Sequence, residues 1–222
     1  SAQVRGTQVS GNGPVLTVRR AIAMIGLEGV RRSALAMRQW PGPLDAAGAA
    51  ELEVTLATAQ RAARLAQALR PAGYDAEMAA LVTLLQNLGR LVLQYHQPEE
   101  MRQVRRLMQP APATEPGQAD QPGMSEQAAG FAVLGADIDS MAQAVARWMG
   151  LGSAADDAVL HLMRRLPLDK PVRNADSDDD VLRALASAAN ETVDALALPA
   201  ARQAMAIERV AKRYARVLDV NA

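Results

Sequence analysis

Five apolar residues recur at offsets of 0, 4, 7, 11 and 14 along one stretch of the chain, which places them on a single face of an α-helix. They are Leu52, Leu56, Ala59, Ala63 and Ala66. Three of the five are alanines, and small side chains let a neighbouring helix approach closely. The stripe therefore predicts a long helix that starts at Asp45, ends at Arg70–Gly73 and packs against other helices.

The composition extends this prediction to the rest of the chain. Alanine and leucine supply 46 and 26 of the 222 residues, whereas Phe, Tyr and Trp together contribute six. Strands favour β-branched and aromatic residues, while Ala, Leu, Met, Arg and Gln are good helix formers. We therefore expect an all-α fold and neither a sandwich nor a barrel.

Further segments show helical periodicity, and the one from Asp75 to Leu93 is the most apolar, with a break expected at Gly89. The other predicted helices are Val15–Gly26, Glu28–Met37, Pro98–Met108, a stripe from Ile138 to Met149 that includes Trp148, Ser153–Arg165, Leu182–Leu196 and Ala200–Leu218. Four prolines and two glycines in fourteen residues predict a flexible loop at 110–123.

Charge and cysteine content exclude several classes of function. The 24 basic residues balance the 24 acidic ones, so the chain lacks the net positive charge that attracts a phosphate backbone. A nucleic-acid partner is therefore not expected. The chain has no cysteine, which rules out disulfides and thiolate metal sites. Its most apolar stretch, Leu81–Leu93, is far shorter than the roughly 20 residues needed to cross a bilayer. We expect a cytoplasmic protein without a membrane partner.

The acidic run 174–180 permits two interpretations. Ser177 with Asp180 three residues later resembles a capping box, and carboxylates in a first helical turn complement the helix dipole. The alternative is a cation site, although the spacing of an EF-hand loop is missing. We favour helix capping.

Side chains that could carry catalysis are scarce. The chain has two histidines, His96 near a helix end and His161 between apolar neighbours, and both are expected to be structural. No zinc-protease, serine-hydrolase, phosphate-loop or dinucleotide motif occurs. The sequence therefore predicts no catalytic residue, no metal ligand and no cofactor.

One segment nevertheless resembles an enzyme motif. Ala79–Leu93 is similar to the central motif of the HD-superfamily phosphohydrolases, in which an apolar helix is followed by His-Asp and then by Leu-Gly-Arg. In that motif an imidazole nitrogen and a carboxylate oxygen jointly hold a divalent metal, which activates water. Gln86 and Asn87 stand in place of that pair here, and because carboxamides lack both the charge and the imidazole, metal affinity should collapse.

Other matches resemble the HDOD branch of this superfamily, which is a bacterial signalling module. They are Thr17–Arg32, Tyr95–Glu99, Leu134–Ala136 with Ala146–Leu151, and Ala188–Glu191. The resemblance covers residues 1–198 and implies an orthogonal helical bundle like that of the HD superfamily, with an amino-terminal helical lobe missing. It places Gln86 and Asn87 in a vestigial site, with His161 and Asn190 as residues of the former cleft. Residues 199–222 are expected to form a helix that packs on the domain or on a partner.

The resemblance implies a non-catalytic module that binds a signalling protein or an adjacent regulatory domain, with a kinase as one candidate. Two alternatives stay open. The chain could be a divergent metal-dependent phosphohydrolase that acts on a nucleotide or a cyclic dinucleotide through His161, Asp156 and Asp157. It could also act by forming a homo-oligomer through its last helix.

Overall fold

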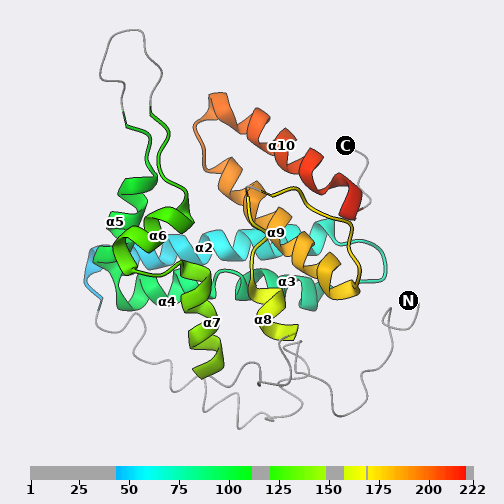
Figure 1. Ribbon diagram of the computed structural model, residues 1–222, viewed down its shortest axis with the longest axis horizontal. Coiled ribbons are helices and arrows are strands. Elements are labelled where there is room, and N and C mark those ends of the chain that lie inside the picture. The colour runs from blue at the N-terminus through cyan, green and yellow to red at the C-terminus, as the bar shows by residue number, and fades with distance from the viewer. Residues whose placement is uncertain (1–43, 112–120, 149–157, 169, 219–222) are drawn as a thin grey trace. The chain divides into compact units, whose positions relative to one another are not determined.

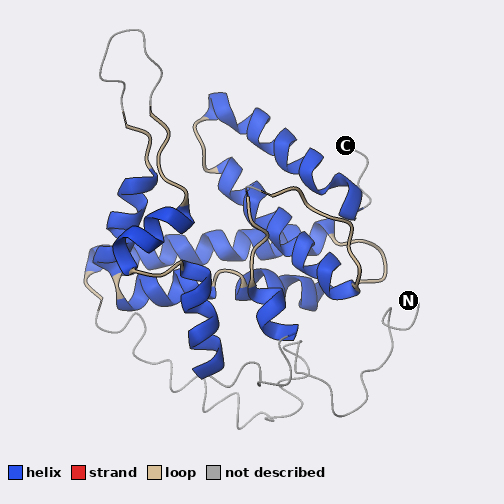
Figure 2. Ribbon diagram, in the orientation of Figure 1, coloured by secondary structure: helices blue, strands red, loops and turns tan. Residues whose placement is uncertain are grey.

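The structure is a computed structural model, and it describes residues 44–111, 121–148, 158–168 and 170–218. Across these residues the chain forms nine α-helices and no strand (Figures 1 and 2), so the all-α prediction is confirmed. The two helices predicted before Leu44 lie outside the described residues. Chain contacts divide the molecule into two compact units.

The first unit contains, among the described residues, 56–87 and 161–218. Its helices are the carboxyl-terminal part of α2 (Ala46–Leu69), then α3 (Ala76–Leu85), the end of α8 (Ala158–Met163), α9 (Asp178–Leu196) and α10 (Ala200–Leu218). Both α3 and α10 pack against α9. The last helix has the bounds that its periodicity predicts, and its packing partner lies in the same unit.

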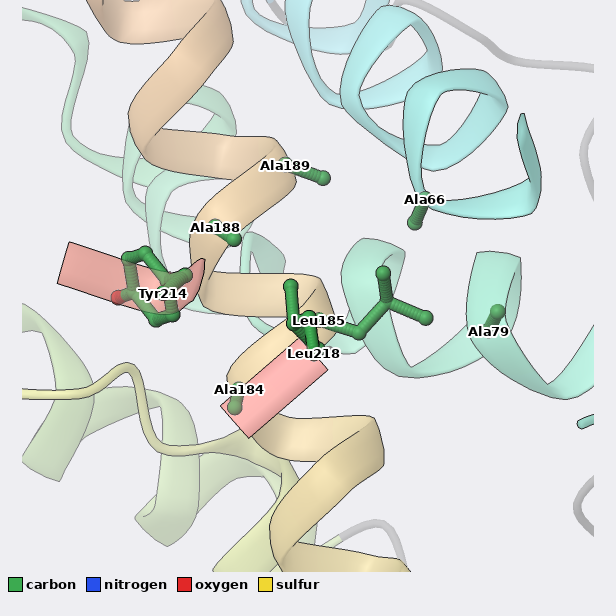
Figure 3. Close-up of a cluster of buried hydrophobic side chains, with 8 residues drawn as sticks. All are labelled: Ala66, Ala79, Ala184, Leu185, Ala188, Ala189, Tyr214 and Leu218. Carbon is green, nitrogen blue, oxygen red and sulfur yellow. The ribbon is translucent and has the colours of Figure 1, made fainter. Parts of the chain in front are cut away.

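The core of the first unit is built mainly from small side chains. One buried cluster, drawn in Figure 3, joins α2, α3, α9 and α10. Its members are Ala66, Ala79, Ala184, Leu185, Ala188, Ala189, Tyr214 and Leu218. A second cluster joins Val82 and Leu162 to α9. The predicted stripe of α2 accounts for part of this packing, because Ala59, Ala63 and Ala66 are all buried.

The second unit contains, among the described residues, 44–55, 88–111, 121–148 and 158–160. Its helices are the start of α2, then α4 (Leu88–His96), α5 (Pro98–Met108), α6 (Glu126–Leu134) and α7 (Ile138–Trp148). The core is a cluster of Leu93, Met101, Val104, Ala129 and Ile138. Of the predicted loop 110–123, the structure describes the two ends, which pair through an isolated bridge between Ala111 and Gln121.

Two local predictions are wrong: the helix break expected at Gly89, and the place of Trp148 on the apolar stripe of its helix. The helix breaks between Leu85 and Leu88 rather than at Gly89, which lies inside α4. A Cβ at Gly89 would come within 2.6 Å of the Ile138 carbonyl oxygen and 2.9 Å of the Ala142 Cβ, so this glycine allows α4 and α7 to approach closely.

That close approach sets which face of α7 is buried. The buried residues are Ile138, Ala142 and Ala146, whereas Trp148, which the predicted stripe included, is 88% exposed.

Among the described helices, none is by itself long and apolar enough to cross a membrane. One bent pair, α3 with α4, meets the length and composition criteria when the two helices are taken together.

Candidate functional site

Gln86 and Asn87 lie at the carboxyl end of α3, where the helix tightens and stops. The Asn87 amide donates to the Leu84 carbonyl three residues earlier, at 2.9 Å. The Asn87 side chain also turns back, and its Nδ2 donates to the Thr83 carbonyl at 2.9 Å. The carbonyls of a last helical turn lack hydrogen-bond partners within the helix. The side-chain amide of Asn87 therefore supplies a donor to the Thr83 carbonyl near the end of α3. Both residues are buried, at 4% and 3% exposure.

The Gln86 amide uses both its nitrogen and its oxygen. Its Nε2 donates to the Leu162 carbonyl at 3.1 Å and to the Arg183 carbonyl at 3.3 Å. Its Oε1 accepts from Asn190 Nδ2 at 3.2 Å and from Ser187 Oγ at 3.4 Å. One side chain therefore ties the end of α3 to α8 and α9.

Asn87 is equally engaged on its other side. Its Nδ2 donates to Asn190 Oδ1 at 2.8 Å, and its Oδ1 accepts from an Arg165 guanidinium nitrogen at 2.6 Å. Arg165 also donates to Asp194 at 3.0 Å. We call Gln86, Asn87, Asn190, Ser187 and Arg165 the amide network.

The two carboxamides at the centre of the amide network, Gln86 and Asn87, are fully hydrogen-bonded, whereas Arg165 Nε is buried and has no hydrogen-bond partner. Each hydrogen of the Gln86 and Asn87 carboxamides has an acceptor, and each carboxamide oxygen has a donor. Buried polar groups are costly unless they are paired. The geometry therefore stabilises the junction of α3, α8 and α9, and it leaves neither amide oxygen of the pair without a donor.

A divalent metal does not fit these donors. Such a metal is held mainly by carboxylates or imidazole nitrogens, with neutral carbonyl oxygens as additional ligands. The three amide residues are neutral, and their oxygens already accept hydrogen bonds within the protein. In the part of the chain that the structure describes, no group of three or more His, Asp or Glu side chains is placed to hold a metal.

His161 is not part of the amide network. Its Nε2 lies 3.0 Å from Asp180 Oδ1, and the side chain is 41% exposed. Asp180 belongs to the first turn of α9, where its backbone amide donates to Ser177 Oγ at 3.1 Å. Ser177 is therefore the N-cap of α9, as the capping interpretation predicted.

The carboxyl group of Asp180 is held in its charged form. Partial burial raises its pKa, but hydrogen bonds from Ser177 and His161 outweigh burial, so the pKa of Asp180 lies below its ordinary value. The other predicted histidine, His96, ends α4 and is exposed.

Of the four predicted site residues, the structure brings Gln86, Asn87 and Asn190 together and leaves His161 apart. Ser187 and Arg165 are members of the network that were not predicted as site residues. Ser187 carried a detectable signal in the sequence, because it is a polar residue among the apolar residues of α9. The structure buries it, at 1% exposure. Arg165 belongs to an Arg164–Arg165 pair, which we interpret from the sequence as part of a solvated face with an anion-binding surface as the alternative, whereas its side chain is 14% exposed.

The second unit contains an apolar cavity of about 160 Å³. It is lined by Gly89, Val92, Leu93, Met141, Ala144 and Val145. None of the predicted site residues lines it.

The sequence model of a family described as the HDOD domain matches residues 7–136, more than half of the 222 residues, so the predicted resemblance is confirmed. The match includes Gln86 and Asn87 and ends before α9. No curated protein and no solved structure matches the chain.

Proposed function

The chain belongs to the HDOD family, and from this premise we propose that it is a non-catalytic signal-transduction and protein-interaction module built on an inactive HD scaffold. It works in the bacterial cytoplasm and binds a signalling protein or an adjacent regulatory domain, with a kinase as the first candidate to test. In this proposal Gln86 and Asn87 are the remnant of the metal-binding pair.

The full hydrogen bonding of the Gln86 and Asn87 carboxamides is the observation that supports this proposal. A hydrolase of this superfamily would need an imidazole and a carboxylate at these positions to hold the metal that activates water. Gln86 and Asn87 instead form hydrogen bonds with Asn190, Arg165 and backbone carbonyls. The same positions thus serve packing, and a scaffold without turnover can act only through what binds to it.

The phosphohydrolase alternative gains no support from the described residues. His161, its proposed ligand, faces the capped end of α9 through Asp180. The other two ligands, Asp156 and Asp157, lie outside the described residues. The packing of α10 accounts for part of the last helix without a second copy of the chain, because Tyr214 and Leu218 are buried in a cluster with residues of the chain's own α9.

Elemental analysis tests the proposal directly. The protein is purified without chelator and without a metal affinity step, and its metal content is measured beside a Gln86→His/Asn87→Asp variant. We expect far less than one equivalent in both, because restoring two ligands does not restore a full set. About one equivalent in the unmodified protein, or hydrolysis of a cyclic dinucleotide that Asp156→Ala and Asp157→Ala abolish, would overturn it.

Interaction is tested separately with purified components. A candidate kinase or receiver domain is titrated against the chain, and binding is measured by calorimetry with the Gln86→His/Asn87→Asp variant alongside. We expect the kinase or receiver domain to bind the chain specifically, and we expect the chain not to hydrolyse a phosphoester substrate. A panel of such domains that all fail to bind would count against the interaction role.

A further inference from the structure

The last helix holds its place through a small part of its surface. Of the 19 residues of α10, Tyr214 and Leu218 are buried, and both lie in its second half. In the first half Met205 is 67% exposed. Burial of apolar area is the main source of docking free energy, so α10 is secured on α9 mainly at its carboxyl-terminal end.

A buried acid lies beneath that end. Glu191 of α9 has a side chain that is 12% exposed, and Tyr214 donates its hydroxyl to Glu191 Oε1 at 2.5 Å. The Arg213 guanidinium lies 3.6 Å from Glu191 Oε2. Both partners belong to α10, and the remaining charge that acts on Glu191 is Asp194, one turn further along α9.

Arg213 serves the acid poorly because it is engaged elsewhere. Its two terminal nitrogens donate to the Leu168 and Pro167 carbonyls, at 3.1 and 2.6 Å. Its Nε is buried and has no hydrogen-bond partner. An ionised carboxylate that is removed from water needs close, well-aligned partners to offset its desolvation. Here the partners are one neutral hydroxyl and a guanidinium nitrogen that lies 3.6 Å away and donates its hydrogen bond to a carbonyl.

The acid carries a net penalty as a result. Burial raises the pKa of Glu191, and the hydrogen bond from Tyr214 and the charge of Arg213 offset only part of that rise, so its pKa stays above the ordinary value. When α10 leaves α9, Glu191 returns to water and its pKa returns toward the ordinary value. Glu191 therefore binds a proton more readily when α10 is docked on α9 than when α10 is undocked.

The α9–α10 turn can act as a hinge. It consists of Ala197, Leu198 and Pro199, and Gln203 Nε2 donates to the Leu196 and Leu198 carbonyls at 3.0 and 2.8 Å. These bonds belong to the turn and the first turn of α10, so they need not break when the far end of the helix lifts.

We propose that α10 is a proton-linked latch that docks firmly on α9 while Glu191 carries a proton and loosens as a unit when Glu191 is ionised. The latch concerns contacts between α9 and α10 and does not depend on the amide network being catalytically silent. It gives the fold a movable helix whose release uncovers the apolar surface around Ala188 and Ala189.

Amide hydrogen exchange across pH tests the latch. In the intact chain, exchange of the amides of residues 210–218 is corrected for intrinsic rates and compared with that of α9 between pH 5 and 8. We expect the opening constant of α10 to rise by roughly threefold or more as pH increases, while α9 stays protected. Glu191→Gln keeps an acceptor for Tyr214 without the charge, so it should remove the pH dependence and protect α10 at pH 8.

The control is Glu208→Gln, the same substitution at an exposed site on α10, and its pH profile should match that of the unmodified protein. Tyr214→Phe provides a second readout, because loss of the hydroxyl donor raises the pKa of Glu191 further and moves the transition to higher pH. The proposal is overturned if Glu191→Gln keeps the original pH dependence, or if α10 exchanges only together with α9.

Discussion

Asn87 and Asn190 are 103 positions apart in the sequence, yet Asn87 Nδ2 donates to Asn190 Oδ1 at 2.8 Å inside the protein. The same Asn190 donates through its Nδ2 to Gln86 Oε1. Asn190 of α9 thus forms hydrogen bonds with both Gln86 and Asn87 at the end of α3. These two bonds hold α3 and α9 in a fixed register. Removing the Asn190 side chain should therefore lower the free energy of unfolding more than removing a polar side chain that bonds only within its own helix.

Asn190→Ala should lower the free energy of unfolding by about 1–3 kcal/mol, because one buried hydrogen of Asn87 Nδ2 loses its acceptor, while Gln86 Oε1 keeps the Ser187 hydroxyl as a donor. Urea unfolding followed by circular dichroism measures the change. Thr192→Ala is the control two residues away, since its hydroxyl bonds only the Ala188 carbonyl of its own helix, and we expect a loss below about 1 kcal/mol. Equal losses in the two variants would show that the contact has no special weight.

Gly89→Ala should destabilise the packing of α4 on α7. The new methyl would lie 2.6 Å from the Ile138 carbonyl oxygen, and a backbone atom in a helix cannot move aside without displacing the helix. We expect a loss of about 1–3 kcal/mol, the usual cost of overpacking, even though alanine is the better helix former. Thermal or urea unfolding measures it.

Gly130→Ala is the matched control in α6. A Cβ there meets Ile138 Cγ1 at 3.4 Å and the Ala136 carbonyl oxygen at 3.6 Å, which is ordinary contact. The variant should gain up to about 1 kcal/mol from helix propensity. If both glycines tolerate alanine equally, the close approach at Gly89 is not a requirement of the fold.

Ser177→Ala should cost about 1 kcal/mol, the typical value of an N-cap, because Asp180 loses the acceptor for its backbone amide. The effect should be the same with and without added calcium or magnesium, which separates the capping interpretation from the cation-site alternative. Thermal unfolding in both conditions measures it. A stabilisation by either cation that disappears in Ser177→Ala would favour the cation site instead.

The sequence predicted those parts of the fold that depend on local periodicity. The face of α2 from Leu52 to Ala66 and the bounds of α10 follow from a 3.6-residue repeat, which acts within one helix. The rotation of α7 does not, because it is set by the close approach at Gly89, and so the exposure of Trp148 was missed. A local repeat cannot report which of two candidate faces meets a neighbour that is distant in sequence.

The candidate site divides in the same way. Gln86 and Asn87 could be found because they interrupt a recognisable motif. Their partners could not, since two of the acceptors are the backbone carbonyls of Leu162 and Arg183, and a carbonyl carries no side-chain identity that a sequence could reveal. Residues that a motif marks are thus visible in the sequence, whereas the groups that complete their hydrogen bonding are visible only in the fold.

In the second unit, Glu51 should make stability sensitive to acid. It accepts from Gln94 Nε2 at 3.0 Å, from Arg102 Nε at 2.9 Å and from an Arg105 terminal nitrogen at 2.8 Å. Burial raises the pKa of Glu51, but these hydrogen bonds and charges outweigh it, so the pKa lies below the ordinary 4.5. The folded state therefore binds the proton less readily than the unfolded state. The stability that Glu51 contributes is present above pH 4.5 and is lost as pH falls through its lowered pKa.

Glu51→Gln should reduce stability at pH 7 and flatten the fall in stability below pH 4.5, because the variant has no proton to take up. Urea unfolding at pH 7, 5, 4 and 3 provides the comparison. Glu53→Gln, two residues along on the exposed side of α2, should leave the acid profile close to that of the unmodified protein. If Glu51→Gln loses stability below pH 4.5 as steeply as the unmodified protein, the acid sensitivity arises from other carboxylates, and the contacts of Glu51 to Arg102 and Arg105 do not hold its charge in the folded state.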